Sequence, residues 1–383
     1  MDYVYVIVQA ISINFLEELK SQPDALKDTF NYIVGEGKPQ FLKIRDFLKK
    51  GGITKLIFTG MGSSFVSSYL PYYILNQYGI AVEIREAGEF LFNTFPNVKQ
   101  NCFKDTGIII ISQSGKSGEI RELLRKINEI ELNDKPLTIG ITNNPDSYLA
   151  YMTELQIFMN FDEEVSVTSK SYVCTLLLLY VMAKTIIGKF FTNETEIQNV
   201  EAFLGEVRSF LQDQKQINKL WKGLLSSFGH DIDFLEILSR GPSLTSAHQA
   251  ALNFKEIVKS YSEASSISTF RHGGIECLKE STKLIILSSD KENFEFNIQF
   301  IDKLVNEWAC GKILHITNQE FDEKAKKLHD DPKIVTYKHK IKDPHLAPIM
   351  EIIILQLLFY KMAEKKGIEP GVFKYSRKIT DDL

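Results

Sequence analysis

Cysteine is scarce in this 383-residue chain, and its four cysteines stand far apart. No two of them form a CxxC pair, so the sequence contains neither a zinc ribbon nor a disulfide framework, and it fits a reducing cytoplasm. The seven histidines include no HxxxH pair. We therefore expect a cytoplasmic protein that binds no metal and no other cofactor.

Long apolar runs and an excess of one charge are missing as well. The longest apolar run, Tyr172–Ala183, is much shorter than the roughly 20 residues that a bilayer span needs. Lysine and arginine number 45 and the acids 49, which leaves a net charge of −4. This balance argues against a membrane or a nucleic acid as partner. The apolar first eight residues carry Asp2 and no positive segment, so we expect no signal peptide.

Short apolar strands alternate with helices along most of the chain. Helices are expected from Asn14 to about Leu48 and again in a polar connector from Glu194 to about Trp221. The predicted strands are 56–58, 81–84, 107–111, 137–141, 234–238 and 284–287. Continuous apolar strands between helices indicate parallel sheets that are covered on both faces. The pattern predicts an α/β fold of two tandem units.

Serine-rich turns follow two of the predicted strands. Their polar residues are Ser63 and Ser64 after the strand at 56–58, and Ser112, Gln113, Ser114 and Ser117 after the strand at 107–111. The carboxyl ends of parallel strands are where open α/β sheets bind ligands, and hydroxyls there suit an anion. Neither turn has the spacing of a Walker loop or of GxGxxG, which disfavours a nucleotide. Each turn alone also fits an ordinary capped connection, but the pair predicts a phosphate monoester held by neutral donors.

The second half of the chain lacks this chemistry. At the corresponding strand end it has Ser288, Ser289 and Asp290, and an aspartate would repel phosphate. We therefore expect one phosphate site per chain.

A carboxylate and an imidazole stand in the second half. Glu256 lies late in a predicted helix, and His272 follows 16 residues later in a serine-rich loop that ends in two glycines. Such a pair beside a sugar phosphate can transfer protons next to a carbonyl. Taken alone, the pair is weak evidence, because most glutamates on helices are solvated and most histidines in loops take no part in catalysis.

Several spaced motifs are similar to those of the family of proteins with two SIS (sugar isomerase) domains. The chain resembles most the isomerase half of glucosamine-6-phosphate synthase, from about Glu17 to its last residues. The segments that carry the resemblance are Gly60–Ser64, Ser112–Glu119, Glu163–Lys170, Lys255–Ile257, Phe270–Gly273 and the tail around Lys378. It implies two tandem SIS domains at 37–211 and 212–366, preceded by an extension and helix at 1–36 and followed by an active-site tail at 367–383.

The resemblance also implies roles for single residues. Glu256 would be the base that moves a proton between C1 and C2 of the sugar, His272 would assist ring opening, and Lys378 would be the active-site lysine of the tail. Phosphosugar-binding roles would fall to Ser63, Ser64, Ser112, Gln113, Ser114 and Ser117, with Ser166 and Thr168 beside the sugar. In the family the loop of His272 reaches the neighbouring subunit, which implies a homodimer with shared active sites.

Departures from the synthase narrow the expected reaction. No glutaminase half with its amino-terminal cysteine precedes the matching region, so we expect no glutamine-dependent amination by this chain. Asn253 stands where the synthase has a lysine, and Gly274 where it has a proline. We expect an isomerase or deaminase of a hexose 6-phosphate or an amino-sugar 6-phosphate, of the type that converts glucosamine 6-phosphate to fructose 6-phosphate. The alternatives are a deglycase of amino-acid–sugar 6-phosphates and a sugar-phosphate sensor without turnover.

Overall fold

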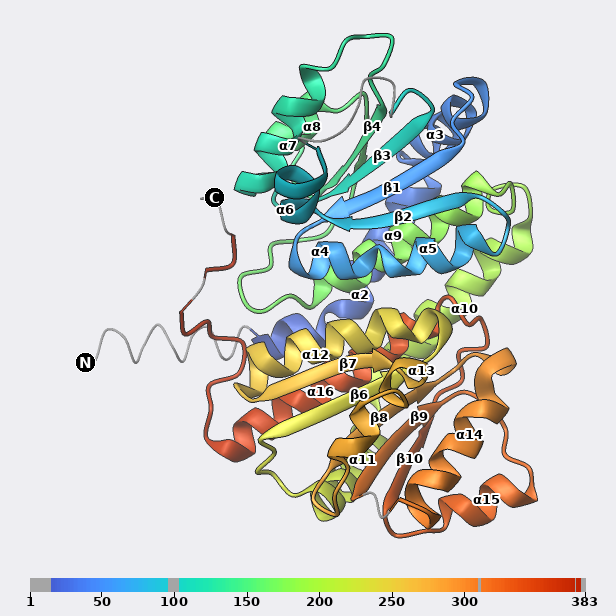
Figure 1. The fold of residues 1–383 in the computed structure, drawn as a ribbon, viewed down its shortest axis with the longest axis vertical. Helices are drawn as coiled ribbons and strands as arrows, with labels where there is room; N and C mark the ends of the chain where they lie inside the picture. The colour runs from blue at the N-terminus through green and yellow to red at the C-terminus, as the bar shows by residue number, and fades with distance from the viewer. Residues whose placement is uncertain (1–14, 96–102, 309–310, 376, 380–383) are drawn as a thin grey trace. The chain divides into compact units, whose positions relative to one another are not determined.

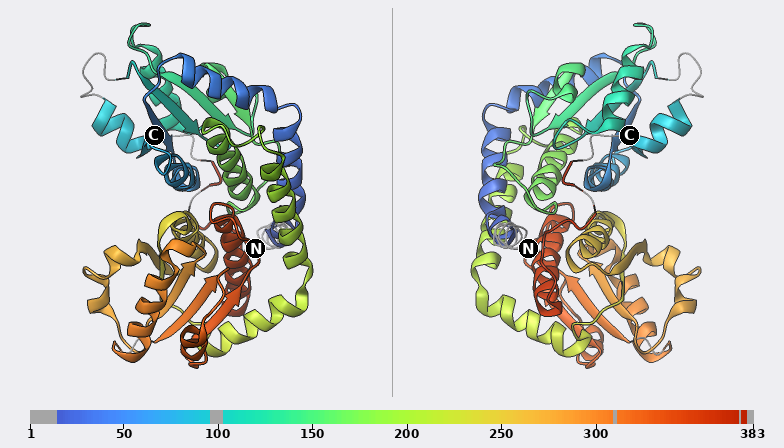
Figure 2. Two further views of the ribbon diagram at one scale, coloured as in Figure 1. Left: turned by 90° about the vertical axis from the view of Figure 1, so that its right-hand side faces the viewer. Right: turned by 90° about the vertical axis from the view of Figure 1, so that its left-hand side faces the viewer.

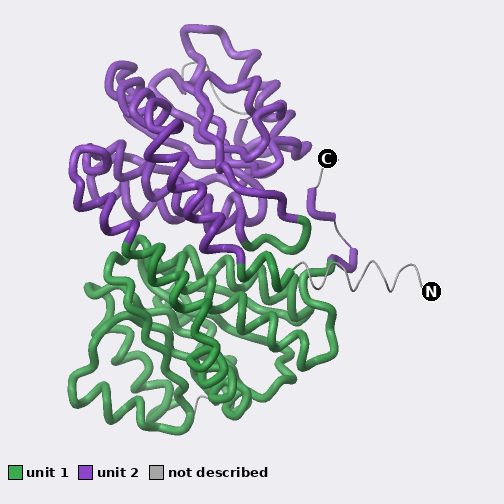
Figure 3. The backbone as a smooth tube through the Cα atoms, turned by 180° about the vertical axis from the view of Figure 1, so that it is seen from behind, with its two compact units in different colours: residues 1–20, 165–169, 202–372 green, residues 21–164, 170–201, 373–383 purple. Residues whose placement is uncertain are grey.

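The computed structural model describes residues 15–95, 103–308, 311–375 and 377–379. The chain forms two units, each assembled from separate stretches (Figure 3). Unit 1 contains the described residues within 1–20, 165–169 and 202–372, and unit 2 those within 21–164, 170–201 and 373–383. The apolar first eight residues lie outside the described ranges. None of the helices in these ranges combines the length and the apolar composition needed to cross a membrane.

Unit 2 is built on a parallel sheet of five strands in the order β2-β1-β3-β4-β5 (Figure 1). The strands are β1 (Lys55–Gly60), β2 (Ala81–Glu86), β3 (Thr106–Ile111), β4 (Leu137–Thr142) and β5 (Leu155–Phe158). The helices are α2 (Gln22–Val34), α3 (Lys38–Lys50), α4 (Gly62–Ser67), α5 (Tyr69–Asn76), α6 (Ala87–Glu89), a π-helical turn (Phe90–Thr94), α7 (Gly118–Asn128), α8 (Tyr148–Met152) and α9 (Lys170–Ile186).

The central strand β3 explains why this sheet is covered by helices. All six of its residues are buried, and successive side chains point to opposite faces. Ile108 and Ile110 belong to one buried cluster with Leu123 and Ile127 of α7. Helices lie on both faces of the sheet (Figure 2), as a strand that is apolar throughout requires.

Unit 1 repeats this topology with the order β7-β6-β8-β9-β10. Its strands are β6 (Phe234–Ser239), β7 (Tyr261–Ser266), β8 (Lys283–Ser288), β9 (Lys312–Thr317) and β10 (Ile334–Lys338). Its helices are α11 (Gln214–Phe228), a 3-10 turn (Gly241–Ser243), α12 (Leu244–Val258), α13 (Ile267–Phe270), a second 3-10 turn (Gly274–Cys277), α14 (Lys291–Asn306), α15 (Glu323–His329) and α16 (Ala347–Lys366). The helix α10 (Glu194–Gln212) contributes residues to both units.

These two parallel sheets with flanking helices confirm the predicted tandem α/β fold. All six predicted strands are present, whereas β5, β7, β9 and β10 have no counterpart in the sequence-based prediction. The serine-rich segment before His272, expected above to be a loop, forms in its first part the edge strand β7 and the helix α13. The difference has a physical reason: β7 pairs only with β6, so its polar side chains stay partly hydrated and show no apolar period.

Candidate functional site

In unit 2 the two predicted serine turns lie at adjacent strand ends. β1 pairs with β3 in parallel, with Gly60 opposite Ile111. Ser63 and Ser64 follow β1 at the start of α4, and Ser112 directly follows β3. β1 also lies between β2 and β3, so the chain reverses its direction of winding here. In open α/β sheets this switch point is where ligands bind.

The loop after β3 is compact and internally hydrogen-bonded. The Ser112 hydroxyl accepts the Gly115 N–H at 3.1 Å and lies 3.5 Å from the Ser117 hydroxyl. The Ser114 hydroxyl accepts the Lys116 N–H at 3.2 Å. Gly115 has φ +64°, and a Cβ at this position would lie 2.2 Å from the Ser147 hydroxyl. Only glycine fits both the left-handed conformation and this close approach.

The same loop is attached to the neighbouring strand. The Gln113 carbonyl accepts the Thr142 hydroxyl at 3.1 Å and the Asn143 N–H at 2.9 Å. Gln113, Ser114 and Ser117 remain partly exposed, whereas Ser112 is buried. The structure thus brings Ser112, Gln113, Ser114 and Ser117 together and places Ser63 and Ser64 after the adjacent strand. Their phosphate-binding role stays a prediction.

In unit 1 a chain of side-chain amides orients Glu256, which is half-buried on α12. The Gln356 amide donates to Asn253 Oδ1 at 3.1 Å. The NH₂ group of Asn253 therefore faces the other way, and it donates to Glu256 Oε2 at 3.4 Å. Asn253 also donates to the Thr168 carbonyl at 3.3 Å. The side-chain donor to the Glu256 carboxylate is therefore the neutral amide of Asn253.

Ser166 has its hydrogen bonds within the protein. Its side chain is fully buried, and its hydroxyl donates to the carboxylate of Glu18. The same carboxylate accepts the Val165 N–H at 2.8 Å. Glu18 thus anchors the segment that carries Ser166 and Thr168, although the sequence analysis assigned it no role. The sugar contacts expected for Ser166 and Thr168 stay predictions.

In unit 2 Lys378 of the tail pairs with Glu164, whose side chain is fully buried. Glu164 also accepts the Ser171 N–H at 3.0 Å and the Ser171 hydroxyl at 2.6 Å. Burial alone would raise the pKa of the Glu164 carboxyl. The charge of Lys378 and these hydrogen bonds outweigh burial and lower the pKa below its usual value.

The Lys378→Met variant is expected to unfold at lower denaturant concentration at pH 7, because Glu164 would remain as a buried charge without its cation. The free energy of unfolding is expected to fall by about 3 kcal/mol. A carboxyl whose pKa is lowered by folding stabilises the folded state at pH values above its pKa in the unfolded chain. This stabilisation is lost as the pH falls through the pKa of the folded state. The difference from the parent should therefore shrink at pH 4. Urea denaturation at both pH values measures it.

The matched control for this variant is Lys374→Met, which removes an exposed lysine of the same tail. This change should leave stability nearly unaltered at either pH, as is usual for an exposed charge. Equal effects of the two substitutions, or an equal loss at both pH values, would show that the pair does not stabilise the fold.

His272 lies in the exposed turn after α13, where its backbone N–H donates to the Thr269 carbonyl at 2.9 Å. The hydrogen bonds described for unit 1 do not connect it to Glu256. The nearby departure at Gly274 has a packing reason: a Cβ there would lie 2.3 Å from the buried ring of Phe270. The catalytic role of His272 and the shared dimer site stay predictions.

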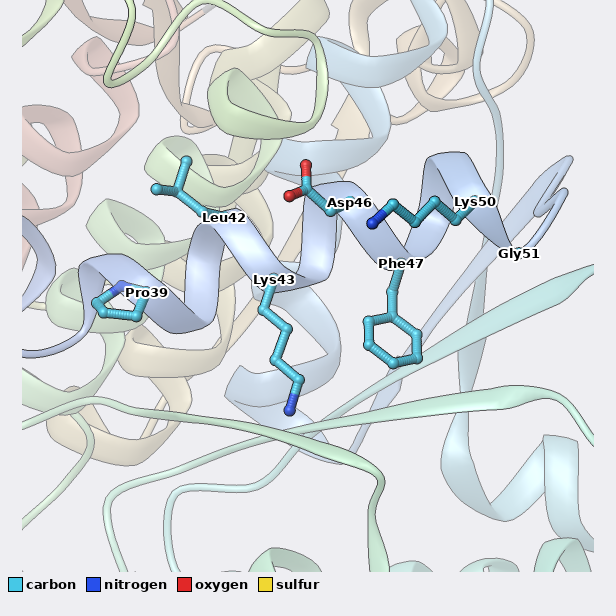
Figure 4. A pocket seen from close by; sticks show the side chains of 7 residues that line it. All are labelled: Pro39, Leu42, Lys43, Asp46, Phe47, Lys50 and Gly51. Carbon is cyan, nitrogen blue, oxygen red and sulfur yellow. The ribbon is translucent and has the colours of Figure 1, made fainter.

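A hollow of about 530 Å³ lies along α3 of unit 2 (Figure 4). Its lining residues, all from α3 and its end, are Pro39, Leu42, Lys43, Asp46, Phe47, Lys50 and Gly51. None of the predicted site residues is among them, and we assign it no function. Within the described ranges, no group of three or more His, Cys, Asp or Glu side chains is arranged to hold a metal ion.

Sequence comparison relates the chain to known proteins. Residues 53–184 match the SIS domain family. Over 365 residues the chain is 25% identical to the glutamine–fructose-6-phosphate aminotransferase (isomerizing) of Clostridium acetobutylicum. The matched region covers 92% of this chain and 56% of that protein. The chain thus spans about half the length of the curated relatives that it matches.

Two solved structures share the architecture of the whole chain. One is the C-terminal domain of glucosamine-fructose-6-phosphate aminotransferase from Francisella tularensis, with a TM-score of 0.76 at 19% identity, covering 94% of this chain and 97% of that one. The other is glucosamine-6-phosphate deaminase from Thermotoga maritima, with a TM-score of 0.70 at 20% identity, covering 96% and 99%. These likenesses confirm the expected arrangement of two α/β units in tandem.

Proposed function

Residues 53–184 form a SIS domain, and from this premise we propose that the protein is a phosphosugar enzyme. Its substrate is a hexose 6-phosphate or the 2-amino derivative, and its reaction moves a proton between C1 and C2. The serine loop after β3 holds the phosphate, and Glu256 is the base.

The serine loop at the switch point of unit 2 is the observation that carries the proposal. Its partly exposed hydroxyls follow β3 directly, next to the end of β1. Hydroxyl and backbone N–H donors at the beginning of α7 suit a phosphate dianion. The binding energy of the remote phosphate would then orient the reacting end of the sugar.

Glu256 supplies the chemistry in this proposal. In the open-chain aldose its carboxylate accepts the proton on C2, and the electron pair of the broken bond forms the C1=C2 double bond of an enediol while the carbonyl oxygen is protonated. Returning the proton to C1 yields the ketose. With a 2-amino sugar the intermediate is an enolamine, and water hydrolyses the resulting imine to the ketose and ammonia.

Deamination of an amino-sugar phosphate is the version we favour. Asn253 gives Glu256 an uncharged donor where the synthase has a lysine, and one of the structural neighbours is named a glucosamine-6-phosphate deaminase. Simple aldose–ketose isomerisation and cleavage of an amino-acid–sugar 6-phosphate use the same proton transfer and are the second candidates. A sensor without turnover would not need a carboxylate oriented by Asn253 and Gln356.

Turnover of a phosphosugar panel tests the proposal. The purified protein is incubated in D₂O with glucose 6-phosphate, glucosamine 6-phosphate and fructosamine 6-phosphate, and NMR follows both the product and the deuterium at carbon. The unphosphorylated sugars are the matched controls. We expect turnover and exchange with one phosphorylated sugar only. Binding without exchange for the whole panel would favour the sensor, and neither binding nor exchange would refute the proposal.

We further propose that the enzyme is a homodimer in which His272 serves the partner's site. Chains carrying Glu256→Gln and chains carrying His272→Asn should each be inactive, and exchange of subunits between them should restore part of the activity. Some mixed dimers would then contain one intact composite site. If native mass spectrometry shows mixed dimers and no activity returns, His272 does not act across the interface.

A further inference from the structure

Unit 1 contains a buried carboxylate surrounded by serine hydroxyls, and the mechanism makes no use of it. Glu351 lies on the buried helix α16 and is fully inaccessible to solvent. Its Oε1 accepts the hydroxyls of Ser243 at 2.9 Å and Ser289 at 2.6 Å. Its Oε2 is hydrogen-bonded to Ser246. Three neutral donors, from the 3-10 turn before α12, from α12 itself and from the loop after β8, therefore converge on one acidic side chain.

The position of this cluster matches that of the serine loop in unit 2. Both sheets have the same strand order, so β6 and β8 of unit 1 correspond to β1 and β3 of unit 2. Ser243 and Ser246 follow β6, and Ser289 directly follows β8. The pair β6–β8 is parallel, with Ser239 opposite Leu287. The cluster thus lies at the switch point of unit 1, where open α/β sheets bind ligands.

One of the three hydroxyls is held in its orientation by a histidine. The Ile341 N–H donates to Nδ1 of His339 at 3.3 Å, so the ring proton belongs on Nε2. Nε2 lies 2.9 Å from the Ser289 hydroxyl, to which it can donate. Ser289 then directs its own proton to Glu351. Burial lowers the pKa of His339 to about 3, which keeps this ring neutral.

Glu351 differs in its partners from the other buried carboxylate, Glu164. Glu164 is paired with a lysine, whereas the hydrogen-bond partners of Glu351 are hydroxyls. Burial accordingly raises the pKa of the Glu351 carboxyl to about 7, although the hydrogen bonds from Ser246, Ser289 and Ser243 act against the rise. Serine hydroxyls are also the side-chain donors that the loop after β3 presents in unit 2.

We infer that the cluster in unit 1 is a binding site for a small carboxylate that the chain fills with its own side chain, Glu351. Ser243, Ser246 and Ser289 are its donors, and a free acetate takes the place of the side chain when Glu351 is cut back to alanine. The fragment lost in that substitution is the size of acetate, and the donors that remain are buried and preorganised.

This inference changes the reason for expecting one phosphate site per chain. Repulsion by Asp290 was the reason given above for expecting no second phosphate site. In the structure Asp290 caps α14 instead, accepting the Glu292 N–H at 3.1 Å. The three hydroxyls of unit 1 are unavailable to an external ligand because they already bind Glu351.

Chemical rescue by acetate tests the inference. Glu351→Ala should lower the thermal unfolding temperature of the full chain, since it leaves the buried hydroxyls of Ser243 and Ser289 without their carboxylate acceptor. The Ser246 hydroxyl keeps the Ser243 carbonyl as an acceptor at 2.9 Å. Sodium acetate at pH 6.5 should then raise that temperature by several degrees more than sodium chloride of equal ionic strength. Isotope-labelled acetate should bind at one per chain by NMR. The parent protein should show neither effect.

The matched control is Ile354→Ala on the same helix, which shortens a fully buried apolar side chain. Acetate should not stabilise it beyond the effect of chloride. If acetate raises the unfolding temperature of both variants equally, or of neither, the inference is wrong. Should Glu351→Ala fail to fold, the refolding yield in acetate against chloride decides in the same way, since equal yields overturn the inference.

A second variant separates binding from simple repair of a cavity. Combining Glu351→Ala with Ser289→Ala keeps the space but removes the donor that His339 orients. The apparent Kd for acetate should be at least tenfold higher in this double variant than in the single variant. Equal rescue of the two would mean that the hydroxyls do not bind the carboxylate, and it would overturn the inference.

Discussion

Glutamine in place of Glu256 is expected to lower turnover of the phosphosugar roughly 10²–10⁴-fold, the range for loss of a general base. The amide keeps the size of the carboxylate, and its oxygen can still accept the hydrogen bond that Asn253 donates to Glu256 at 3.4 Å. Substrate binding should therefore change little, so the loss appears in kcat rather than in KM. Steady-state kinetics with deuterium exchange at the substrate carbon measures both.

The control for this variant is Glu323→Gln, which removes an exposed carboxylate at the start of α15 in the same unit. Its kinetics should match those of the parent. Near-full turnover by Glu256→Gln, with normal exchange of the carbon-bound proton, would show that another group is the base. A rise in KM alone would instead assign Glu256 to substrate binding.

Aspartate in place of Ser114 is expected to weaken phosphosugar binding at least about 10³-fold. Two like charges about 4 Å apart near a protein surface repel by about 4 kcal/mol, and each 1.4 kcal/mol is a factor of ten. The fold should survive, because the Ser114 hydroxyl accepts the Lys116 N–H and an aspartate accepts the same hydrogen bond in a turn. Calorimetric titration with the phosphosugar measures the affinity.

Ser226→Asp is the matched control, since Ser226 is an exposed serine on α11 of the other unit. It adds the same charge and should leave the affinity unaltered. Unchanged affinity in Ser114→Asp would place the phosphate elsewhere. The two predictions also separate the parts of the proposed site: Ser114→Asp loses binding, whereas Glu256→Gln keeps binding and loses turnover.

The sequence alone determined the features of this protein that depend on short stretches of chain. Strands such as Gly107–Ile111 are apolar throughout, and this pattern, alternating with helices, is typical of parallel sheets that are buried on both faces. The serine turns adjoin such strands, so their place at the edge of the sheet follows from the strands. The motifs around Glu256 and His272 are equally local, and they carried the resemblance to the SIS family.

Edge strands could not be predicted in the same way. β7 reads as a polar, serine-rich stretch because it has a partner on one side only and its side chains stay partly hydrated. Its strand conformation comes from the parallel ladder with β6, which the local sequence does not reveal. Buried polar contacts leave one signal in the sequence, a polar residue within an otherwise apolar helix. Glu351 and Gln356 of α16 are two examples.

Only the tertiary structure decided which polar groups meet. Glu18 bonds Ser166 across 148 positions, Gln356 bonds Asn253 across 103, and Lys378 pairs with Glu164 across 214. Nothing in the sequence around Glu164 distinguishes it from Glu163, yet Glu164 alone is buried against a lysine. The physical reason is that a buried polar group must find a partner, and which partner lies within reach depends on how the whole chain packs rather than on its neighbours in sequence.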